Sequence, residues 1–399
     1  MGITRRQLLT GAAAGAGGVV IGAAGASAVA ASQPPETPAP AGSEIEPFYG
    51  VHQSGIATPA QAYAAFAAYD LRAGEGRESM SRMMRLLSDD AARLTQGVPA
   101  LGDTEPELAM SPSRLTITFG FGPAFFDKVG LADQRPPSLE PLPSFSIDQL
   151  QDRWNGGDVL IQICADDPIV VSHAQRMLWK DARSFVTARW LQRGFLSARG
   201  SAEPGTTGRN LMGQVDGTIN PRTPEQFDAM VWSDGPPAWL AGGTELAVRR
   251  IAMDLDRWDR VDRPDRESTI GRTLDSGAPL TGTEEFDAPD LDAVDDAGFP
   301  VIADWAHIRR ARAATGADGP QFLRRGYNYD EGEDVDGVTD AGHVFTAYAA
   351  DLATQFIPVQ QALSDIDLLN QWTTPIGSAV FALPPGASEG GWVGETLLG

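Results

Sequence analysis

The order in which strand-like and helix-like segments follow one another constrains the fold of this chain more than any other feature. In the first half, apolar and β-branched residues predict strands at 62–71, 114–121, 158–164 and 185–191. Helices are predicted at 79–94, where apolar residues recur every three or four positions, and at 167–179. The order strand, helix, strand, strand, helix, strand is typical of a ferredoxin-like unit, a sheet covered by helices on one side.

The second half of the chain repeats this order more loosely and with longer insertions. Its predicted elements are strands at 247–255, 321–329 and 343–352 and a helix at 353–363. We therefore predict an α+β fold of duplicated ferredoxin-like units, 46–224 and 225–399. Their antiparallel sheets, flanked by helices, are expected to pack into one dimeric-ferredoxin-like body. Hydrophobic residues make up 42% of the chain, which is enough for a large core.

The segment 265–300 is rich in Asp, Gly and Pro, and this composition predicts a surface loop. Its acidic residues lack the regular spacing and the closing glutamate of a calcium-binding loop, and the same holds for 330–340. Solvated acidic loops are therefore the better interpretation of both segments.

Residues 1–32 are predicted to be a secretory signal and not part of the fold. Arg5 and Arg6 precede an uncharged run dominated by Ala, Gly and Val, a pattern that indicates the twin-arginine export machinery. An uncleaved membrane anchor is the alternative interpretation. Residues 33–45, with four prolines, are predicted to be a flexible linker. The expected location is the periplasm, the cell envelope or the extracellular space.

Charge and cysteine content exclude several classes of function. Acidic side chains outnumber basic ones by 53 to 31, a formal charge of −22, and such a field repels nucleic acids. The single cysteine, Cys164, cannot form an intrachain disulfide, a cysteine-based zinc site or an iron–sulfur cluster. Chemistry that needs an imidazole must therefore use one of four histidines: His52, His173, His307 and His343.

His307 differs from the other histidines in its surroundings. It is followed by Arg309 and Arg310, and a second arginine pair stands at 324–325. Such a density of guanidinium groups suits an anionic cofactor that carries carboxylates. His173 and His343 have no obvious partner in the sequence, and a lone histidine in a core is more often a structural residue.

A glycine-flanked turn at 213–217, with the sequence Gly-Gln-Val-Asp-Gly, is a second candidate for chemistry. Its two glycines let the backbone approach something flat, and they present Asp216 on a tight turn. An ordinary turn that is closed by an aspartate hydrogen bond is the alternative interpretation.

Together these segments resemble the dye-decolourising peroxidases, specifically their exported, twin-arginine branch. The matching stretches, in chain order, are 52–59, 130–136, 157–167, 213–217, 307–309, 324–327 and 375–386. The resemblance implies a duplicated ferredoxin-like barrel that holds one haem b per chain, mainly against its second half. It also implies that hydrogen peroxide is reduced and that aromatic or dye-like donors are oxidised through a ferryl radical intermediate. It leaves a homo-oligomer open.

Position by position, the resemblance implies that His307 is the proximal ligand to iron, that Asp216 is the distal acid–base group and that Arg324 is the distal arginine. Neighbouring residues on a strand face opposite sides, so only one of Arg324 and Arg325 can face the iron, and Arg325 is the alternative. The resemblance also implies further cofactor contacts by Gly217, Thr218, Ile219 and, with a haem propionate, Arg309.

Three departures from the family pattern bear on redox tuning more than on haem binding. Gln214 stands where a phenylalanine is usual, and 312–314 is Arg-Ala-Ala in place of Asn-Pro-Arg. Gln371 stands near a position that often carries a glutamate, which would accept the N–H of the proximal histidine. Asp365, Asp367 or neither could serve instead.

Two rival functions stay open at this point. One is a deferrochelatase-like protein that binds haem and releases its iron, with incidental peroxidase activity. The other is a non-catalytic ferredoxin-like module that binds no haem. A Soret absorption band in the purified protein separates the second rival from the haem proteins.

Overall fold

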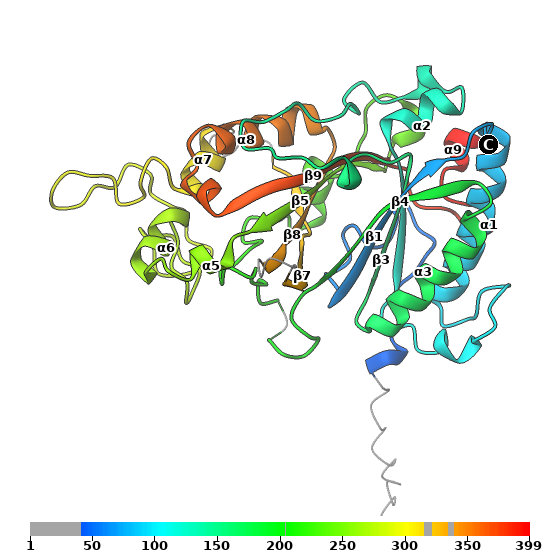
Figure 1. Ribbon diagram of the computed structural model, residues 1–399, viewed down its shortest axis with the longest axis horizontal. Coiled ribbons are helices and arrows are strands. Elements are labelled where there is room, and N and C mark those ends of the chain that lie inside the picture. Colours follow the sequence, from blue (N-terminus) through cyan, green and yellow to red (C-terminus); the bar gives the residue numbers. More distant parts are fainter. Residues whose placement is uncertain (1–40, 204, 315–320, 334–338) are drawn as a thin grey trace, which may run out of the picture. The chain divides into compact units, whose positions relative to one another are not determined.

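The computed structural model describes residues 41–203, 205–314, 321–333 and 339–399 (Figure 1). The predicted export signal at 1–32 and the predicted linker up to residue 40 lie outside the described residues. Within these described ranges, none of the helices combines the length and the apolar character that a bilayer crossing requires.

The first half of the chain forms the predicted ferredoxin-like unit. Its elements are β1 (Tyr63–Leu71), α1 (Arg77–Thr95), β2 (Thr116–Phe121), α2 (Pro123–Lys128), β3 (Val159–Ala165), α3 (Pro168–Ala182) and β4 (Val186–Phe195). The strands are antiparallel and lie in the order β2-β3-β1-β4. Side chains of β1 alternate between two cores: Ala65 and Ala67 pack in the helix-covered core, whereas Phe66 packs in the core between the two halves.

The second half repeats the same strand order. Its elements are α4 (Pro224–Met230), β5 (Thr244–Met253), β6 (Leu323–Arg324), β7 (Tyr327–Glu333), β8 (Thr339–Ala349), α8 (Leu352–Ile366), β9 (Thr373–Leu383) and α9 (Glu395–Leu398). Its strands lie in the order β9-β5-β8-β7, with β6 also on β8. The sequence analysis does not predict β9, which carries Pro375. The proline is tolerated because it follows a register shift between Arg250 and Ile251 of the partner strand.

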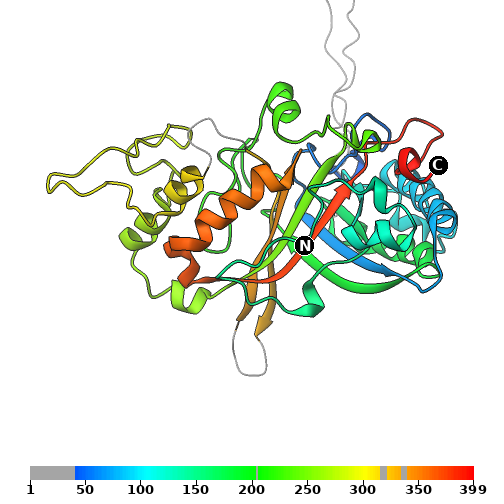
Figure 2. The same cartoon turned by 90° about the horizontal axis from the view of Figure 1, so that it is seen from above.

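The two halves join along both edges of their sheets. Phe121 of β2 pairs with Ala382 of β9, and Phe195 of β4 pairs with Asn328 of β7. Together with the β5–β8 ladder, these contacts close eight strands into a barrel. The views in Figures 1 and 2 place α1 and α3 on one side of the strands and α7 (His307–Ala313) and α8 on another.

The long insertion between β5 and β6 is only in part the surface loop predicted at 265–300. It begins with α5 (Leu255–Trp258) and α6 (Arg263–Ile270), so the predicted loop starts inside a helix. The missed signal is Asp262, whose side chain accepts a hydrogen bond from the backbone N–H of Asp265 and caps α6, with a proline in the first turn. Ile270 and Arg272, which follow, are buried against the cavity described below.

A buried ion pair attaches the segment before β3 to the second sheet. Arg249 on β5 and Asp148 are hydrogen-bonded, and both side chains are buried. Arg249 also donates to Ser378 Oγ at 3.2 Å. Replacing Asp148 by alanine would leave a buried guanidinium without its carboxylate partner, so we expect the free energy of unfolding to fall by about 3–5 kcal/mol.

Denaturant unfolding of the Asp148→Ala variant measures this loss. The matched control is Glu78→Ala, which breaks the exposed Glu78–Arg82 pair on α1 and is expected to have little effect on the unfolding free energy. Equal small effects of the two substitutions would contradict the assigned role of the buried pair.

Candidate active site

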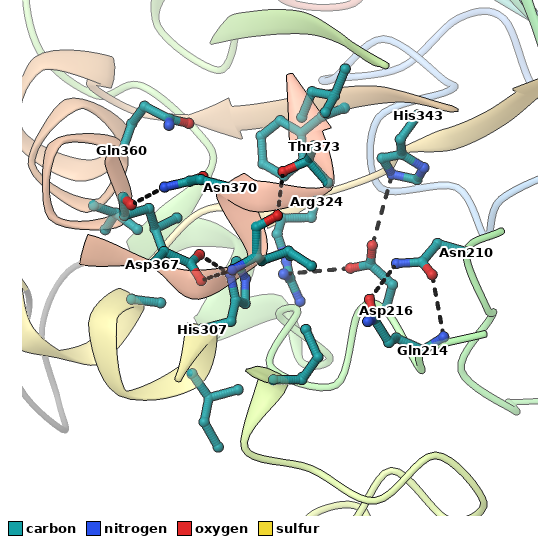
Figure 3. Close-up of a pocket in the computed structure, with 18 of the residues that line it drawn as sticks. Asn210, Gln214, Asp216, His307, Arg324, His343, Gln360, Asp367, Asn370 and Thr373 are labelled. Carbon is teal, nitrogen blue, oxygen red and sulfur yellow. Dashed lines mark hydrogen bonds and ion pairs between the residues drawn. The ribbon is translucent and has the colours of Figure 1, made fainter. Parts of the chain in front are cut away.

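A cavity opens among the 210–219 turn, β5, α6, α7, β8 and α8, and we call it the main cavity. It has about 1370 Å³ of empty space, a volume that includes its open mouth. Most of the side chains that line it are apolar, among them Ile251, Met253, Ile270, Ile308, Phe345, Phe356, Val359, Leu363 and Leu369. Figure 3 shows two groups of polar side chains in it, one around His307 and one around Asp216.

His307 is the first residue of α7, and Asp367 fixes its imidazole. Nδ1 of His307 lies 2.6 Å from Oδ2 of Asp367, which is almost fully buried at the end of α8. The other oxygen of Asp367 accepts the backbone N–H of Leu369 at 3.0 Å, so the carboxylate cannot swing away. With Nδ1–H donated to Asp367, Nε2 of His307 keeps a free lone pair, which is the arrangement of a metal-binding histidine.

The charge and hydrogen bond of Asp367 and the charge of Asp216 together outweigh burial, the largest single effect on the pKa of His307. Burial lowers the pKa of the imidazole, but the neighbouring Asp367 carboxylate raises it, and the net pKa lies above the usual histidine value. Of the carboxylates left open by the sequence, the structure therefore selects Asp367. The side chain of Asp365 instead accepts a hydrogen bond from Gln361 at 2.9 Å.

The second group is built on the 213–217 turn. Gly213 and Gly217 have φ values of +85° and +128°, a backbone region that disfavours residues with a Cβ. The side chain of Asn210 closes the turn by accepting the backbone N–H groups of Met212 and Gln214. Gln214, the departure from the usual phenylalanine, accepts a hydrogen bond from the Asn210 amide at 3.2 Å.

Asp216 projects from this turn toward two basic side chains. Its Oδ1 lies 3.4 Å from Nη1 of Arg324, and its Oδ2 lies 3.8 Å from Nε2 of His343. Burial raises the pKa of Asp216, but the charges of Arg324, His343 and His307 together lower it by more than burial raises it. The net pKa is therefore below the usual carboxyl value. Asp216 is therefore ionised at neutral pH.

Arg324 and Arg325 face opposite sides of the chain, as the period of a strand predicts. Arg324 lines the main cavity, and Asn220 holds its backbone by donating to its carbonyl at 2.6 Å and accepting its N–H at 2.9 Å. The guanidinium of Arg325 instead hydrogen-bonds to the carbonyl of Thr58 and to Gln61. The arginine beside Asp216 is thus Arg324.

Of the other predicted cofactor contacts, two line the main cavity, one lines an adjoining cavity and one lines neither. Thr218 and Ile219 line the main cavity, and Gly217 lines a second cavity that adjoins it. Arg309 is not among the lining residues, since its guanidinium donates to the carbonyls of Leu291 and Ile302 in the insertion. Its position does not support the predicted contact with a haem propionate.

Arg272 and Arg312 line the cavity instead, and the sequence analysis did not select either of them. The signal for Arg312 is helical spacing: the α7 residues that line the cavity are 307, 308, 311 and 312, and Arg309 and Arg310 are not on this face. Burial, followed by the charges of Arg312 and Arg324, lowers the pKa of Arg272. A concentration of positive charge in a buried site favours an anionic ligand.

The remaining histidines divide into one cavity residue and two structural ones. His343 lines the cavity beside Asp216, although the sequence shows no partner for it. His173, which lies on α3, pairs with Asp103 at 2.8 Å. His52 stacks on Trp232, and its Nδ1 lies 2.6 Å from the carbonyl oxygen of Gly242.

Comparison with known proteins gives concordant matches to one family. The family model described as Dyp-type peroxidase, N-terminal matches residues 53–196, and the one described as Dyp-type peroxidase, C-terminal matches 207–388. A dye-decolorizing peroxidase of Thermobifida fusca is 40% identical over 360 residues, covering 87% of this chain and 83% of the relative. A deferrochelatase of Shigella flexneri is 36% identical over 415 residues, covering 99% and 97%.

Solved structures agree with the sequence comparisons. A DyP-type peroxidase from Cellulomonas bogoriensis has 50% identity and a TM-score of 0.87, covering 90% of this chain and 99% of that one. Ferric DtpA from Streptomyces lividans has 43% identity and a TM-score of 0.86, covering 90% and 98%. The strands of the barrel and both groups of the main cavity lie within the matched ranges.

Proposed function

This chain belongs to the Dyp-type peroxidase family and is therefore a haem peroxidase, and from this premise we propose that His307 binds the iron while Asp216 and Arg324 act on hydrogen peroxide. The electron donors are aromatic or dye-like molecules. The observation that carries the proposal is that one apolar cavity contains both a carboxylate-held imidazole and an ionised carboxylate beside a guanidinium.

The residues of the main cavity fit haem in three respects. The apolar lining suits the macrocycle, and His307 offers an unoccupied Nε2 to a metal. Arg312 and Arg272, whose Nη1 also donates to the carbonyls of Gly277 and Glu285, offer guanidinium groups to the two carboxylates of haem. Within the part of the chain that the structure describes, the guanidinium of Arg312 makes no hydrogen bond or ion pair, so its charge is available to such a carboxylate.

Each polar residue then has one task in the reaction. When bound, haem supplies the iron at which peroxide is reduced and through which electrons pass from the donor. Asp216 takes a proton from one peroxide oxygen and returns it to the other, which leaves as water. Arg324 stays protonated and stabilises the negative charge that develops as the O–O bond breaks. Asp367 keeps the His307 ring oriented and basic.

The test of this function is the spectrum and turnover of the purified chain. We expect a Soret band after haem is supplied, and oxidation of an anthraquinone or azo dye that depends on hydrogen peroxide. A colourless preparation, even with hemin in excess, would contradict the proposal.

Replacing Asp367 by asparagine is expected to weaken haem binding by ~10–100-fold and to raise the reduction potential of the iron. The neutral amide is a weaker acceptor than the carboxylate and removes a negative charge beside His307. Haem titration and a potentiometric titration measure the two effects. Asp365→Asn is the matched control, since this side chain bonds to Gln361 and not to His307. Equal behaviour of the two variants would contradict the role of Asp367.

A second candidate function is the release of iron from haem. It is favoured by the deferrochelatases, which match over 99% of this chain, whereas the T. fusca peroxidase covers 87%. Iron captured by a ferrous chelator from added haem, set against steady-state peroxide turnover in the same preparation, separates the two activities. Membership of a peroxidase family argues against the third alternative, a non-catalytic module.

Twin-arginine export is a further part of the proposal. It is supported by Arg5 and Arg6 and by the uncharged run that follows them. Replacing both arginines by lysine should retain the protein in the cytoplasm on cell fractionation. Continued export of that variant would contradict this route.

A further inference from the structure

The two oxygens of Asp216 have different neighbours (Figure 3). Oδ1 faces the guanidinium of Arg324 at 3.4 Å, and Oδ2 faces the imidazole of His343 at 3.8 Å. Arg324 carries a permanent charge and disfavours a proton on the oxygen that it faces. A proton that reaches Asp216 is therefore better placed on Oδ2, the oxygen next to His343.

The opposite nitrogen of His343 shows which tautomer is present. His343 on β8 pairs in register with Asn328 on β7, and its Nδ1 lies 3.4 Å from Oδ1 of Asn328. The amide orientation is set because Nδ2 of Asn328 donates to the carbonyl of Arg209 at 3.2 Å. An amide oxygen only accepts hydrogen bonds, so Nδ1 of His343 carries the hydrogen and Nε2 presents a lone pair to Asp216.

Two acceptors thus face one another at 3.8 Å, beyond hydrogen-bond distance but within the range of an ion pair, so a proton on Oδ2 would favour a closer approach of the two atoms. Burial lowers the pKa of His343 and Arg324 lowers it further, while Asp216 raises it, and the net pKa is below the usual histidine value. The imidazole is therefore neutral at neutral pH and free to accept. Asp216 and Arg324 are the charged groups that face it, and its neighbours on β7 and β5, Asn328 and Ile251, are neutral.

The connection between β6 and β7 leaves room for this imidazole at Gly326. A Cβ on Gly326 would lie 2.0 Å from Nε2 of His343, far inside contact distance. The requirement for glycine comes from this close approach, since Gly326 is not among the glycines with positive φ. Glycine at this position thus leaves the imidazole in its place beside Asp216.

We propose that His343 is a positioning residue for Asp216 and shares with it the proton taken from peroxide. This inference rests on the proposed function. The proton leaves the first peroxide oxygen for Oδ2 of Asp216, and Nε2 of His343 accepts a hydrogen bond from it as the two side chains move closer than 3.8 Å. It then returns to the second oxygen as the O–O bond breaks, and water is formed. No net proton is gained or lost by the pair.

Cyanide tests this proton sharing without turnover. At pH 7 free cyanide is hydrogen cyanide and binds ferric haem as the anion, so its proton must pass to a nearby base or to solvent. The parent protein is expected to keep the proton. The His343→Gln variant keeps a polar side chain of similar length that cannot take up a proton. It is expected to release close to one proton per haem into a weakly buffered indicator solution. Its cyanide affinity should fall by at least ~10-fold, which corresponds to a loss of one pKa unit in the proton affinity of the base that accepts the proton.

His173→Gln is the matched control, because it removes another buried histidine next to a carboxylate, far from the cavity in the chain. It should behave as the parent does. Proton retention by His343→Gln, or proton release by the parent, would overturn the proposal. A parent without a Soret band would instead overturn the proposed function, so the two failures are distinct.

Gly326→Ala gives an independent answer, also in the event that His343→Gln does not fold. It keeps the imidazole but pushes it from its place beside Asp216. Proton release on cyanide binding is expected here as well. Retention with the parent's affinity would overturn the proposal.

Discussion

Replacing Asp216 by alanine is expected to leave haem bound while lowering peroxide turnover by ~10²–10⁴-fold, the usual contribution of a positioned acid–base group. The substitution removes the carboxylate that faces Arg324 and His343 but leaves the His307–Asp367 pair intact. Steady-state rates with a dye and hydrogen peroxide measure the loss, and the Soret band measures haem content. The steady-state rate should fall while the Soret band stays unchanged.

The pH dependence of the parent provides a second check on Asp216. Its pKa is held below the usual carboxyl value, so the carboxylate is available as a base at neutral pH and is lost only as the pH falls through that lowered value. The acid limb of the rate profile should therefore lie below ~3.9, the ordinary aspartate pKa.

Asp287→Ala is the control for both measurements, because the lowered pKa of Asp287 comes from the backbone N–H groups of Glu284 and Thr283 in an exposed turn. Full activity of the Asp216 variant, or an equal loss in the control, would contradict the assignment.

The elements that could be predicted from the sequence are those determined by local patterns. In α1 the spacing of Met80, Met83 and Leu87 marks one helix face, and all three side chains are fully buried in the structure. The strands of the first half were predicted to within a few residues because their apolar runs end at turn-forming residues. Their order in the sheet then follows from the ferredoxin-like pattern.

The elements that were missed depend on partners far away in the sequence. The strand β9 contains Pro375 and Gly377, which locally favour a loop, and only its ladder with β5 makes it a strand. Helix α6 was missed because the Asp, Gly and Pro content of the segment outweighed a capping aspartate.

The residues of the site likewise divide into those that a motif in the sequence indicates and those that depend on distant partners. His307, Asp216 and Arg324, which the family pattern selected, line one cavity, whereas the guanidinium of Arg309, which it also suggested, lies against the insertion. The contacts made by Asp367 and His343 join residues separated by 60 and 127 positions, and no local pattern reports such a contact. They depend on the contact of α7 with the end of α8 and on the contact of β8 with the 213–217 turn.

Replacing His307 by alanine is expected to weaken haem binding by more than ~100-fold, since even the loss of a partner behind a metal ligand costs ~10–100-fold. The cavity keeps its apolar lining and its arginines, so some haem should still bind at high concentration, with an altered Soret band. Haem titration followed by absorption measures both effects. His52→Ala is the matched control, because His52 stacks on Trp232 outside the main cavity.

Added imidazole should restore the parent spectrum of the His307→Ala variant, because Asp367 remains held by Leu369 and can accept the N–H of a free imidazole in the vacated space. The double variant His307→Ala, Asp367→Ala lacks that acceptor and should need a much higher imidazole concentration for the same recovery. Rescue distinguishes loss of a ligand from loss of fold, since a collapsed cavity would not respond to imidazole. An unchanged Soret band in His307→Ala before any imidazole is added would show that another residue holds the iron.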